Sequence, residues 1–108
     1  MFYGNIDGFL YTPSADLEPN TIVVSGGLVG VTRQFAPANQ PSWVFFGGPR
    51  SHYGFTLAEA AGAAKDQGTA VYITSEGVLT FTKSTNTLVG YLMTGIAATD
   101  KDIDVIIQ

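Results

Sequence analysis

Short apolar runs separated by turn residues dominate this chain of 108 residues, and the densest set lies in its C-terminal half. These runs are rich in β-branched and aromatic residues, which favour strands; they are Ala70–Thr74, Val78–Lys83 and Leu88–Thr94. Between the first two, Ser75-Glu76-Gly77 suits a three-residue hairpin loop, because glycine adopts a positive φ without a steric clash. The pattern predicts three strands joined by tight turns, that is, a C-terminal meander.

The Ser25-Gly26-Gly27 segment predicts a second hairpin, because it separates the apolar runs Thr21–Val24 and Leu28–Arg33. The same glycines do not form a phosphate-binding loop. The G-x-G-x-x-G spacing is absent, no Lys-Ser or Lys-Thr pair follows, and the next residues have the pattern of a strand rather than a helix.

Ser42–Phe46 predicts a short and strongly apolar strand. Side chains alternate between the two faces of a strand, so Trp43 and Phe45 share one face while Val44 and Phe46 share the other. Because both faces are apolar, each needs to be covered by another part of the protein or by a partner. This strand is therefore expected either in the centre of the fold or at an interface.

Two further segments alternate in the manner of strands, Ser51–Leu57 and Ile103–Ile107. The Ala-rich segment Ala58–Gln67 is the only predicted helix, capped by Thr56 and ending at Gly68. The predicted fold class is all-β, mainly β with one short helix. We expect a small barrel-like or tulip-like domain built from hairpins and the C-terminal meander.

The first 20 residues show no sustained period and carry four aromatic residues among glycines and prolines; these are Phe2, Tyr3, Phe9 and Tyr11. This composition predicts an extended N-terminal arm, part of the same domain, that lies over a neighbouring surface. The alternative is a loop folded back over its own core. Residues 21–108 are expected to form a single β-rich domain, because neither an internal repeat nor a dividing linker is evident.

Composition and charge narrow the classes of partner. The chain is 45% hydrophobic and 13% charged, whereas a well-solvated surface carries roughly 25–35% charged residues. Such a domain is expected to cover apolar surface against copies of itself or against a partner. The net charge of −4 and the scattered lysines and arginines argue against nucleic-acid binding.

Other classes are excluded by what the sequence lacks. There is no cysteine, which excludes disulfides and thiol chemistry. No apolar run approaches the ~20 residues of a membrane span, and the first residues do not have the pattern of a signal peptide. The sequence therefore predicts a soluble protein that is made in the cytosol and does not enter a membrane.

Catalytic and metal-binding motifs are weak. His52 is the single histidine, and Ser51, Ser42 and Asp66 do not provide the spacing of a nucleophile and its base. The segment 100–104 opens like a calcium loop, D-x-D-x-D, but valine stands where an EF-hand requires glycine. We expect these acids to face water at the start of a strand and to blunt a sheet edge. The prediction is a non-enzymatic protein without metal or cofactor.

Five blocks of the sequence, in order, resemble a family of small phage proteins of the capsid-decoration, or head cement, type. This family is often catalogued as a domain of unknown function and mislabelled as phage recombinase. The blocks are Val23–Val31, Phe55–Ala64, Gly68–Thr80, Asn86–Tyr91 and Ala97–Ile107. The last of these differs at Asp104, where the family often has arginine. The resemblance covers roughly residues 19–108.

The resemblance implies a trimeric protein that sits at the three-fold positions of an icosahedral head. There it would bind the outer capsid surface, clamp neighbouring major capsid protein subunits and stabilise the head. With the aromatic residues as anchors, the predicted capsid-binding or subunit-interface residues are Phe2, Tyr3, Phe9, Tyr11, Trp43, Phe45, Phe46, His52 and Tyr53. The alternative is a surface-displayed module that binds host glycans or another receptor, because exposed Trp and Tyr rings can stack on sugars.

Overall fold

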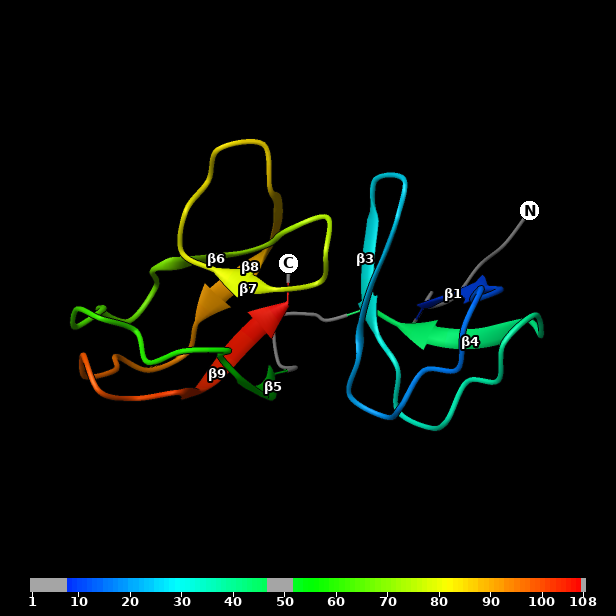
Figure 1. The fold of residues 1–108 in the computed structure, drawn as a ribbon, viewed down its shortest axis with the longest axis horizontal. Coiled ribbons are helices and arrows are strands. Elements are labelled where there is room, and N and C mark those ends of the chain that lie inside the picture. The colour runs from blue at the N-terminus through cyan, green and yellow to red at the C-terminus, as the bar shows by residue number, and fades with distance from the viewer. Residues whose placement is uncertain (1–7, 47–51, 108) are drawn as a thin grey trace, which may run out of the picture. The chain divides into compact units, whose positions relative to one another are not determined.

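The computed structural model describes residues 8–46 and 52–107, and all helices and strands assigned within these ranges are β-strands, with no helix among them (Figure 1). The prediction of an all-β, barrel-like fold is confirmed, since the strands form two sheets and one sheet curls into a half-barrel. The chain divides into two compact units, Met1–Gly47 (unit 1) and Gly48–Gln108 (unit 2). No helix in the described part of the chain is long and apolar enough to cross a membrane.

Unit 1 is a four-stranded antiparallel sheet with the strand order β1-β4-β3-β2. Its strands are β1 (Gly8–Tyr11), β2 (Ile22–Ser25), β3 (Leu28–Val31) and β4 (Ser42–Phe45). The predicted hairpin is confirmed: Ser25 pairs with Leu28 across a two-residue turn in which Gly26 has a φ of +60°. A left-handed residue at this position is what matches a tight turn to the twist of two strands.

Residues 8–20 belong to the sheet of unit 1. β1 pairs with β4 along its length, and Leu17 and Ala36 exchange two backbone hydrogen bonds of 2.8 and 2.9 Å. Only residues 1–7 of the predicted arm fall outside the described residues. The aromatic residues Phe9 and Tyr11 therefore sit on a strand that their own unit orders.

Unit 2 is a five-stranded sheet with the order β5-β9-β8-β6-β7. Its strands are β5 (His52–Thr56), β6 (Ala70–Ile73), β7 (Leu79–Thr80), β8 (Thr87–Leu92) and β9 (Asp102–Ile107). The predicted alternation of the last strand is confirmed, because Ile103, Val105 and Ile107 are all buried. β9 lies between β5 and β8, so the expectation that its acids blunt a sheet edge is wrong.

The three strands of the predicted meander form, but they do not pair in the predicted order. The first hairpin is confirmed, with Thr74 and Val78 hydrogen-bonded at 2.9 Å around a loop in which Gly77 has a φ of +85°. However, β8 pairs with β6 rather than with β7, so β6 lies in the middle. The Asn86 side chain donates to the Thr82 carbonyl at 3.0 Å and the Asn86 amide donates to the Lys83 carbonyl at 2.8 Å, which closes the turn before β8.

The predicted helix over Ala58–Gln67 is wrong. Gly62 adopts a φ of +81°, which an α-helix does not allow. The backbone amides of Ala61 and Gly62 bond instead to the carbonyls of Asp100 and Ala98, at 3.0 and 2.9 Å. Bonds to a distant loop thus replace the local bonds that alanine propensity favours.

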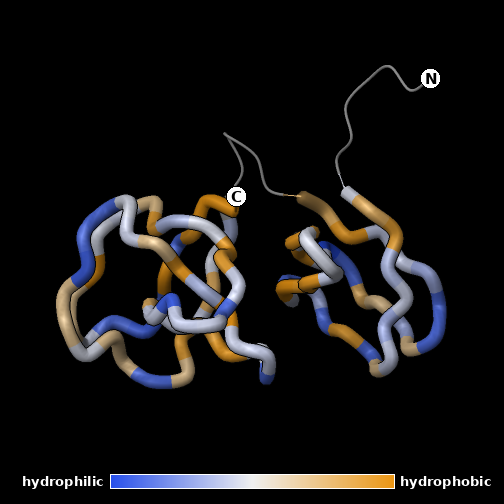
Figure 2. The backbone as a smooth tube through the Cα atoms, turned by 90° about the horizontal axis from the view of Figure 1, so that it is seen from above, coloured by the Kyte–Doolittle hydropathy of each residue, from blue (hydrophilic) through white to orange (hydrophobic). Residues whose placement is uncertain are grey.

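Each unit buries valine and isoleucine from its own strands. In unit 1 the buried strand residues are Val23, Val31 and Val44; in unit 2 they are Phe55, Val71, Ile73, Val89, Leu92, Ile103, Val105 and Ile107. Figure 2 shows hydrophobic stretches along the strands and hydrophilic segments in the outer loops of unit 2. The buried residues of unit 1 come from both faces of its sheet: Val23 and Val44 lie on one face, and Val31 lies on the other, opposite Phe45.

The two units repeat one topology, although no internal repeat is evident in the sequence. Removing β7 from unit 2 leaves the order β5-β9-β8-β6, which corresponds strand for strand to β1-β4-β3-β2. The loop bridges correspond as well: Lys65 and Ile96 exchange two backbone bonds of 3.0 and 2.8 Å, as Leu17 and Ala36 do in unit 1. The chain is a structural duplication.

Hydrogen bonds in the turn before β2 and β6 confirm the correspondence. The Thr21 hydroxyl donates to the Glu18 carbonyl at 2.7 Å, and the Thr69 hydroxyl donates to the Asp66 carbonyl at 2.7 Å. The preceding residues both have a positive φ, +66° at Asn20 and +86° at Gly68. The paired strands that follow carry the same three residues, Leu28-Val29-Gly30 and Leu88-Val89-Gly90.

One prediction concerns Thr32, the buried polar residue of the unit 1 core. Its hydroxyl donates to the Glu18 carbonyl at 2.8 Å and accepts from the Thr21 amide at 2.9 Å. Thr32→Val removes both bonds while keeping the shape, so we expect the free energy of unfolding to fall by about 1–3 kcal/mol. Chemical denaturation measures this, and the control Thr21→Val, which loses an exposed bond, should cost less than about 1 kcal/mol. Equal losses in both variants would contradict the assignment.

Candidate interaction surfaces

β4 presents two different faces, as its alternation predicts. Val44 is fully buried, whereas Trp43 is 40% exposed and Phe45 is half-buried. The Val44 side of the sheet is buried, and on the other side Val31, which pairs with Phe45, is fully buried as well. β4 lies between β1 and β3, so the strand is central in its sheet, and Trp43 is exposed on the outward side.

The outward side of unit 1 gathers four large side chains, Leu10, Arg33, Trp43 and Phe45, which we call the aromatic face. Leu10 pairs with Trp43 across β1 and β4, and Leu10 is 67% exposed. The Trp43 and Phe45 rings meet edge to face, with centroids 6.4 Å apart and planes at 80°. The Arg33 guanidinium carbon lies 4.1 Å from the centre of the Phe45 ring, a cation–π contact that holds the cation against the apolar surface.

Three of the sequence-predicted residues lie on the opposite side of the same sheet. Phe9 pairs with Val44 and Tyr11 with Ser42, so both point to the core side. The Phe9 and Phe46 rings pack with centroids 5.4 Å apart, and both side chains are half-buried. These residues brace the core of unit 1 rather than extend the aromatic face.

The remaining predicted residues belong to unit 2 or lie outside the described residues. His52 and Tyr53 belong to β5 of unit 2, where they pair with Ile106 and Val105, and the Tyr53 ring lies 6.3 Å from that of Phe55. Phe2 and Tyr3 lie outside the described residues. Within the described part of unit 1, Trp43 and Phe45 of the predicted set share one face of the sheet, and Trp43 is exposed on it.

Sequence reasoning missed Leu10 and Arg33. Leu10 stands between two aromatic residues, and its position opposite Trp43 depends on the register of β1 against β4, which the local pattern does not specify. Arg33 follows β3 and reaches Phe45 because β3 and β4 are neighbours, with Val31 opposite Phe45. In both cases the signal is a pairing between distant segments.

The aromatic face is only partly matched in unit 2, where Tyr91, which is 38% exposed, pairs with Ile106. Gly54 and Asp104 form the cross-strand pair that corresponds to Leu10 and Trp43, and Ile106 corresponds to Phe45. Beside them, the Thr56 hydroxyl donates to the Asp102 carboxylate at 3.0 Å. Within residues 8–46 and 52–107, no group of three or more potential ligands is arranged to hold a metal ion.

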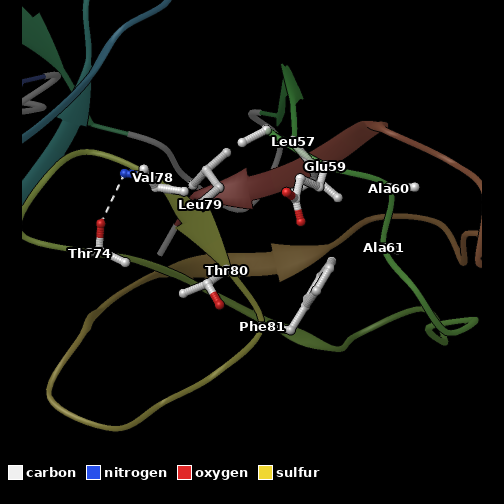
Figure 3. A pocket seen from close by; sticks show the side chains of 10 residues that line it. Leu57, Glu59, Ala60, Ala61, Thr74, Val78, Leu79, Thr80 and Phe81 are labelled. Atoms are coloured by element: carbon white, nitrogen blue, oxygen red, sulfur yellow. Dashed lines mark hydrogen bonds between the residues drawn. The ribbon is translucent and has the colours of Figure 1, made fainter.

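Unit 2 has an open groove, shown in Figure 3. It has a volume of about 480 Å³ and lies between residues 57–61 and the β6–β7 hairpin. Apolar side chains such as Leu57, Val78 and Phe81 line it, and Glu59 is the only titratable group among the lining residues. The Lys65 ammonium stands 5.2 Å from the Phe81 ring. This lining suits the binding of an apolar group and does not pair a nucleophile with a base.

The groove exists because the hairpin of unit 2 is longer. In unit 1 two glycines join β2 to β3, whereas residues 74–86, including β7, join β6 to β8. A β-bulge between Val71 and Tyr72 accompanies the longer connection. The two units have therefore diverged on one face each, unit 1 by aromatic residues and unit 2 by the insertion.

The neighbours of Trp43 favour a protein partner over a glycan. Leu10 and Phe45 flank the ring, whereas a sugar site places hydrogen-bonding groups beside the aromatic platform.

Comparison with family models gives a match over residues 4–107 to the family described as phage cement protein. Neither the curated proteins nor the solved structures contain a match.

Proposed function

The chain belongs to the phage cement protein family, and from this premise we propose that it binds the outer surface of a phage head as a homotrimer at three-fold positions. Family membership gives it a structural role in stabilising the capsid. In the proposed arrangement each trimer contacts neighbouring major capsid protein subunits and holds them together without catalysis.

The observation that carries the proposal is the family match, which spans nearly the whole chain and both units. The surface supports it. Among the residues that the structure describes, seven large hydrophobic side chains are exposed, and only 13% of the residues of the chain are charged. Apolar surface of this extent is typical of a subunit that becomes covered on assembly. Many symmetric copies on one head add avidity, so each contact can be weak.

We expect the purified protein to have three times the monomer mass of 11.4 kDa by light scattering behind a sizing column. It should also co-sediment with expanded heads of its own phage and raise the temperature at which those heads release DNA. Bovine serum albumin at equal concentration is the control for trapping in the pellet. Absence of the protein from pelleted heads would refute the proposed function, and a mass other than that of a trimer would refute the proposed oligomer.

A further inference from the structure

We propose that the edge strand β2 pairs with β2 of a second copy, antiparallel about a twofold axis at Val23, and that this pairing links neighbouring trimers on the head. The inference goes beyond the proposed function, which places each trimer on the capsid and gives it no contact with the next trimer. It rests on that function only for the place where the link acts.

The first observation is that β2 is an unprotected edge of its sheet. Among the described strands of unit 1 it lies at the end opposite β1 (Figure 1). Native sheets usually protect such edges with charged residues, proline, a β-bulge or a covering segment. β2 pairs with β3 without a register shift, and the hairpin 22–31 contains neither a charged residue nor a proline. Its residue Val24 is 36% exposed.

The second observation is that unit 2 covers the corresponding edge with a strand. β6 corresponds to β2, and β7 pairs with β6 in the antiparallel direction on the side away from β8. Tyr72, the counterpart of Val24, lies opposite Thr80 of β7. This topology therefore accepts an antiparallel strand at that edge. Within residues 8–46, unit 1 provides no such strand of its own.

The third observation is which backbone groups of β2 face outward. In an antiparallel pair, residues bonded to the partner strand alternate with residues whose N–H and C=O groups point away from it. The bonded positions begin beside the two-residue turn at Ser25. At the other end of the strand, the Thr32 amide donates to the Thr21 carbonyl at 2.9 Å, which confirms the phase. The N–H and C=O groups of Ile22 and Val24 therefore point to the open edge.

This pattern fits a second copy of the same strand. About a twofold axis at Val23, Ile22 of each copy lies opposite Val24 of the other, and each of these pairs can exchange two backbone hydrogen bonds. The side chains that meet are apolar, so two chains with a net charge of −4 each bring no like charges together in this contact. The contact uses the same patch on both copies, and adjacent three-fold positions of an icosahedral head are related by twofold axes.

The contact is short, and this defines where it forms. The net gain from a few hydrogen bonds is small, and association costs translational and rotational freedom. Trimers therefore stay separate in dilute solution. On a head, neighbouring trimers are held at a high effective concentration, so the same contact forms there and makes head binding cooperative.

Single cysteines test the register, because the chain has no cysteine of its own. Ile22→Cys and Val24→Cys are concentrated and oxidised, each alone and as an equimolar mixture. Opposed residues have Cα atoms about 5.5 Å apart, within reach of a disulfide. Two copies of the same residue lie about 8 Å apart, which is beyond that reach. We expect disulfide-linked dimers on non-reducing gels from the mixture and none from either variant alone.

Val24→Pro tests the link on heads. Proline removes an outward N–H group and its ring blocks strand addition, while no bond to β3 is lost, so an edge strand tolerates it. Val24→Thr is the matched control, because it keeps both the N–H group and the branched shape. In co-sedimentation with expanded heads, we expect sigmoidal binding curves for the wild type and Val24→Thr. Val24→Pro should give a hyperbolic curve with the same number of copies bound at saturation.

Circular dichroism and light scattering check the fold and mass of every variant, and the cysteine test does not depend on the proline variant folding. Absence of linkage in the mixture, or equal linkage in either variant alone, would overturn the inference. So would a hyperbolic curve for the wild type, or a sigmoidal curve for folded Val24→Pro. If the wild-type protein does not bind heads, the proposed function fails instead, and the cysteine mixture still decides whether β2 pairs with β2.

Discussion

Replacing Gly90 with alanine should unfold unit 2 at temperatures where the wild type is folded. A Cβ atom at Gly90 would overlap the backbone carbonyl of Ile106 on the neighbouring strand, and a backbone atom of a central strand cannot move aside. Overpacking a core costs about 1–3 kcal/mol or more, and this clash belongs at the upper end. For a unit of about this size, a loss of about 3 kcal/mol lowers Tm by roughly 12–24 °C.

Thermal denaturation followed by circular dichroism measures the effect, and Gly27→Ala is the matched control. Gly27 is also next to a strand, but a Cβ atom there would meet nothing within 4 Å and its φ is not in the left-handed region. The control should shift Tm by less than about 3 °C. A Gly90→Ala protein as stable as the control would show that β8 and β9 do not pack as closely as the structure places them.

The corresponding position in unit 1, Gly30, has the same constraint, because a Cβ atom there would approach Val44 and the Phe45 carbonyl. The L-V-G sequence thus occurs twice for one physical reason. The third residue lets β3 approach β4 closely, and it lets β8 approach β9 in the same way. A short motif that looks like turn chemistry or generic strand is in fact the mark of the duplication.

The features that the sequence predicted correctly depend on residues that are close together in the chain. The hairpins at Gly26 and Gly77, the alternation of Val44 with Trp43, and the burial of Ile103, Val105 and Ile107 all follow from period and turn residues within a few positions. The family resemblance stated from the sequence is confirmed by the match over residues 4–107. These features required no knowledge of long-range pairing.

The errors share a different cause. Ala58–Gln67 has helical propensity, but its amides are taken by carbonyls some 35–40 residues away, at Asp100 and Ala98. The order of β6, β7 and β8 likewise depends on which edge of the β6–β7 hairpin pairs with β8. The pattern of residues along a single strand does not specify this pairing. Tertiary bonds overrode propensity in both places.

The dependence on pairing between distant segments also explains why the sequence identified only part of the candidate interaction surface. Aromatic residues were chosen by type, and the structure distributes them over the core side of unit 1, its exposed side and β5 of unit 2. What separates Trp43 from Phe9 is their direction relative to the core, and what adds Leu10 and Arg33 is strand register. Placement on the fold, rather than residue type, distinguishes an exposed side chain from one that packs in the core.

Replacing residues 74–86 with Gly-Gly is expected to give a folded protein that has lost the groove but still binds heads. Ile73 and Thr87 already face each other across β6 and β8, as Ser25 and Leu28 do across the two-glycine turn of unit 1. The shortened hairpin therefore copies a connection that this topology already uses. Because Leu79, Thr80 and Phe81 are only half-buried, we expect a loss of about 1–3 kcal/mol of unfolding free energy rather than unfolding.

Circular dichroism, chemical denaturation and co-sedimentation with heads measure the three expected results, with binding within about twofold of wild type. The double variant Val78→Ser, Phe81→Ser is the control, because it removes apolar lining of the groove while keeping chain length. A shortened protein that does not fold would show that β7 is integral to unit 2, and the two units would then share strand order but not an interchangeable hairpin. A folded protein whose binding falls more than tenfold, together with the double variant, would instead place the capsid contact in the groove. Retained binding in both variants would show that head binding does not need the groove, and that the longer hairpin of unit 2 is an addition to the shared topology that binding does not use.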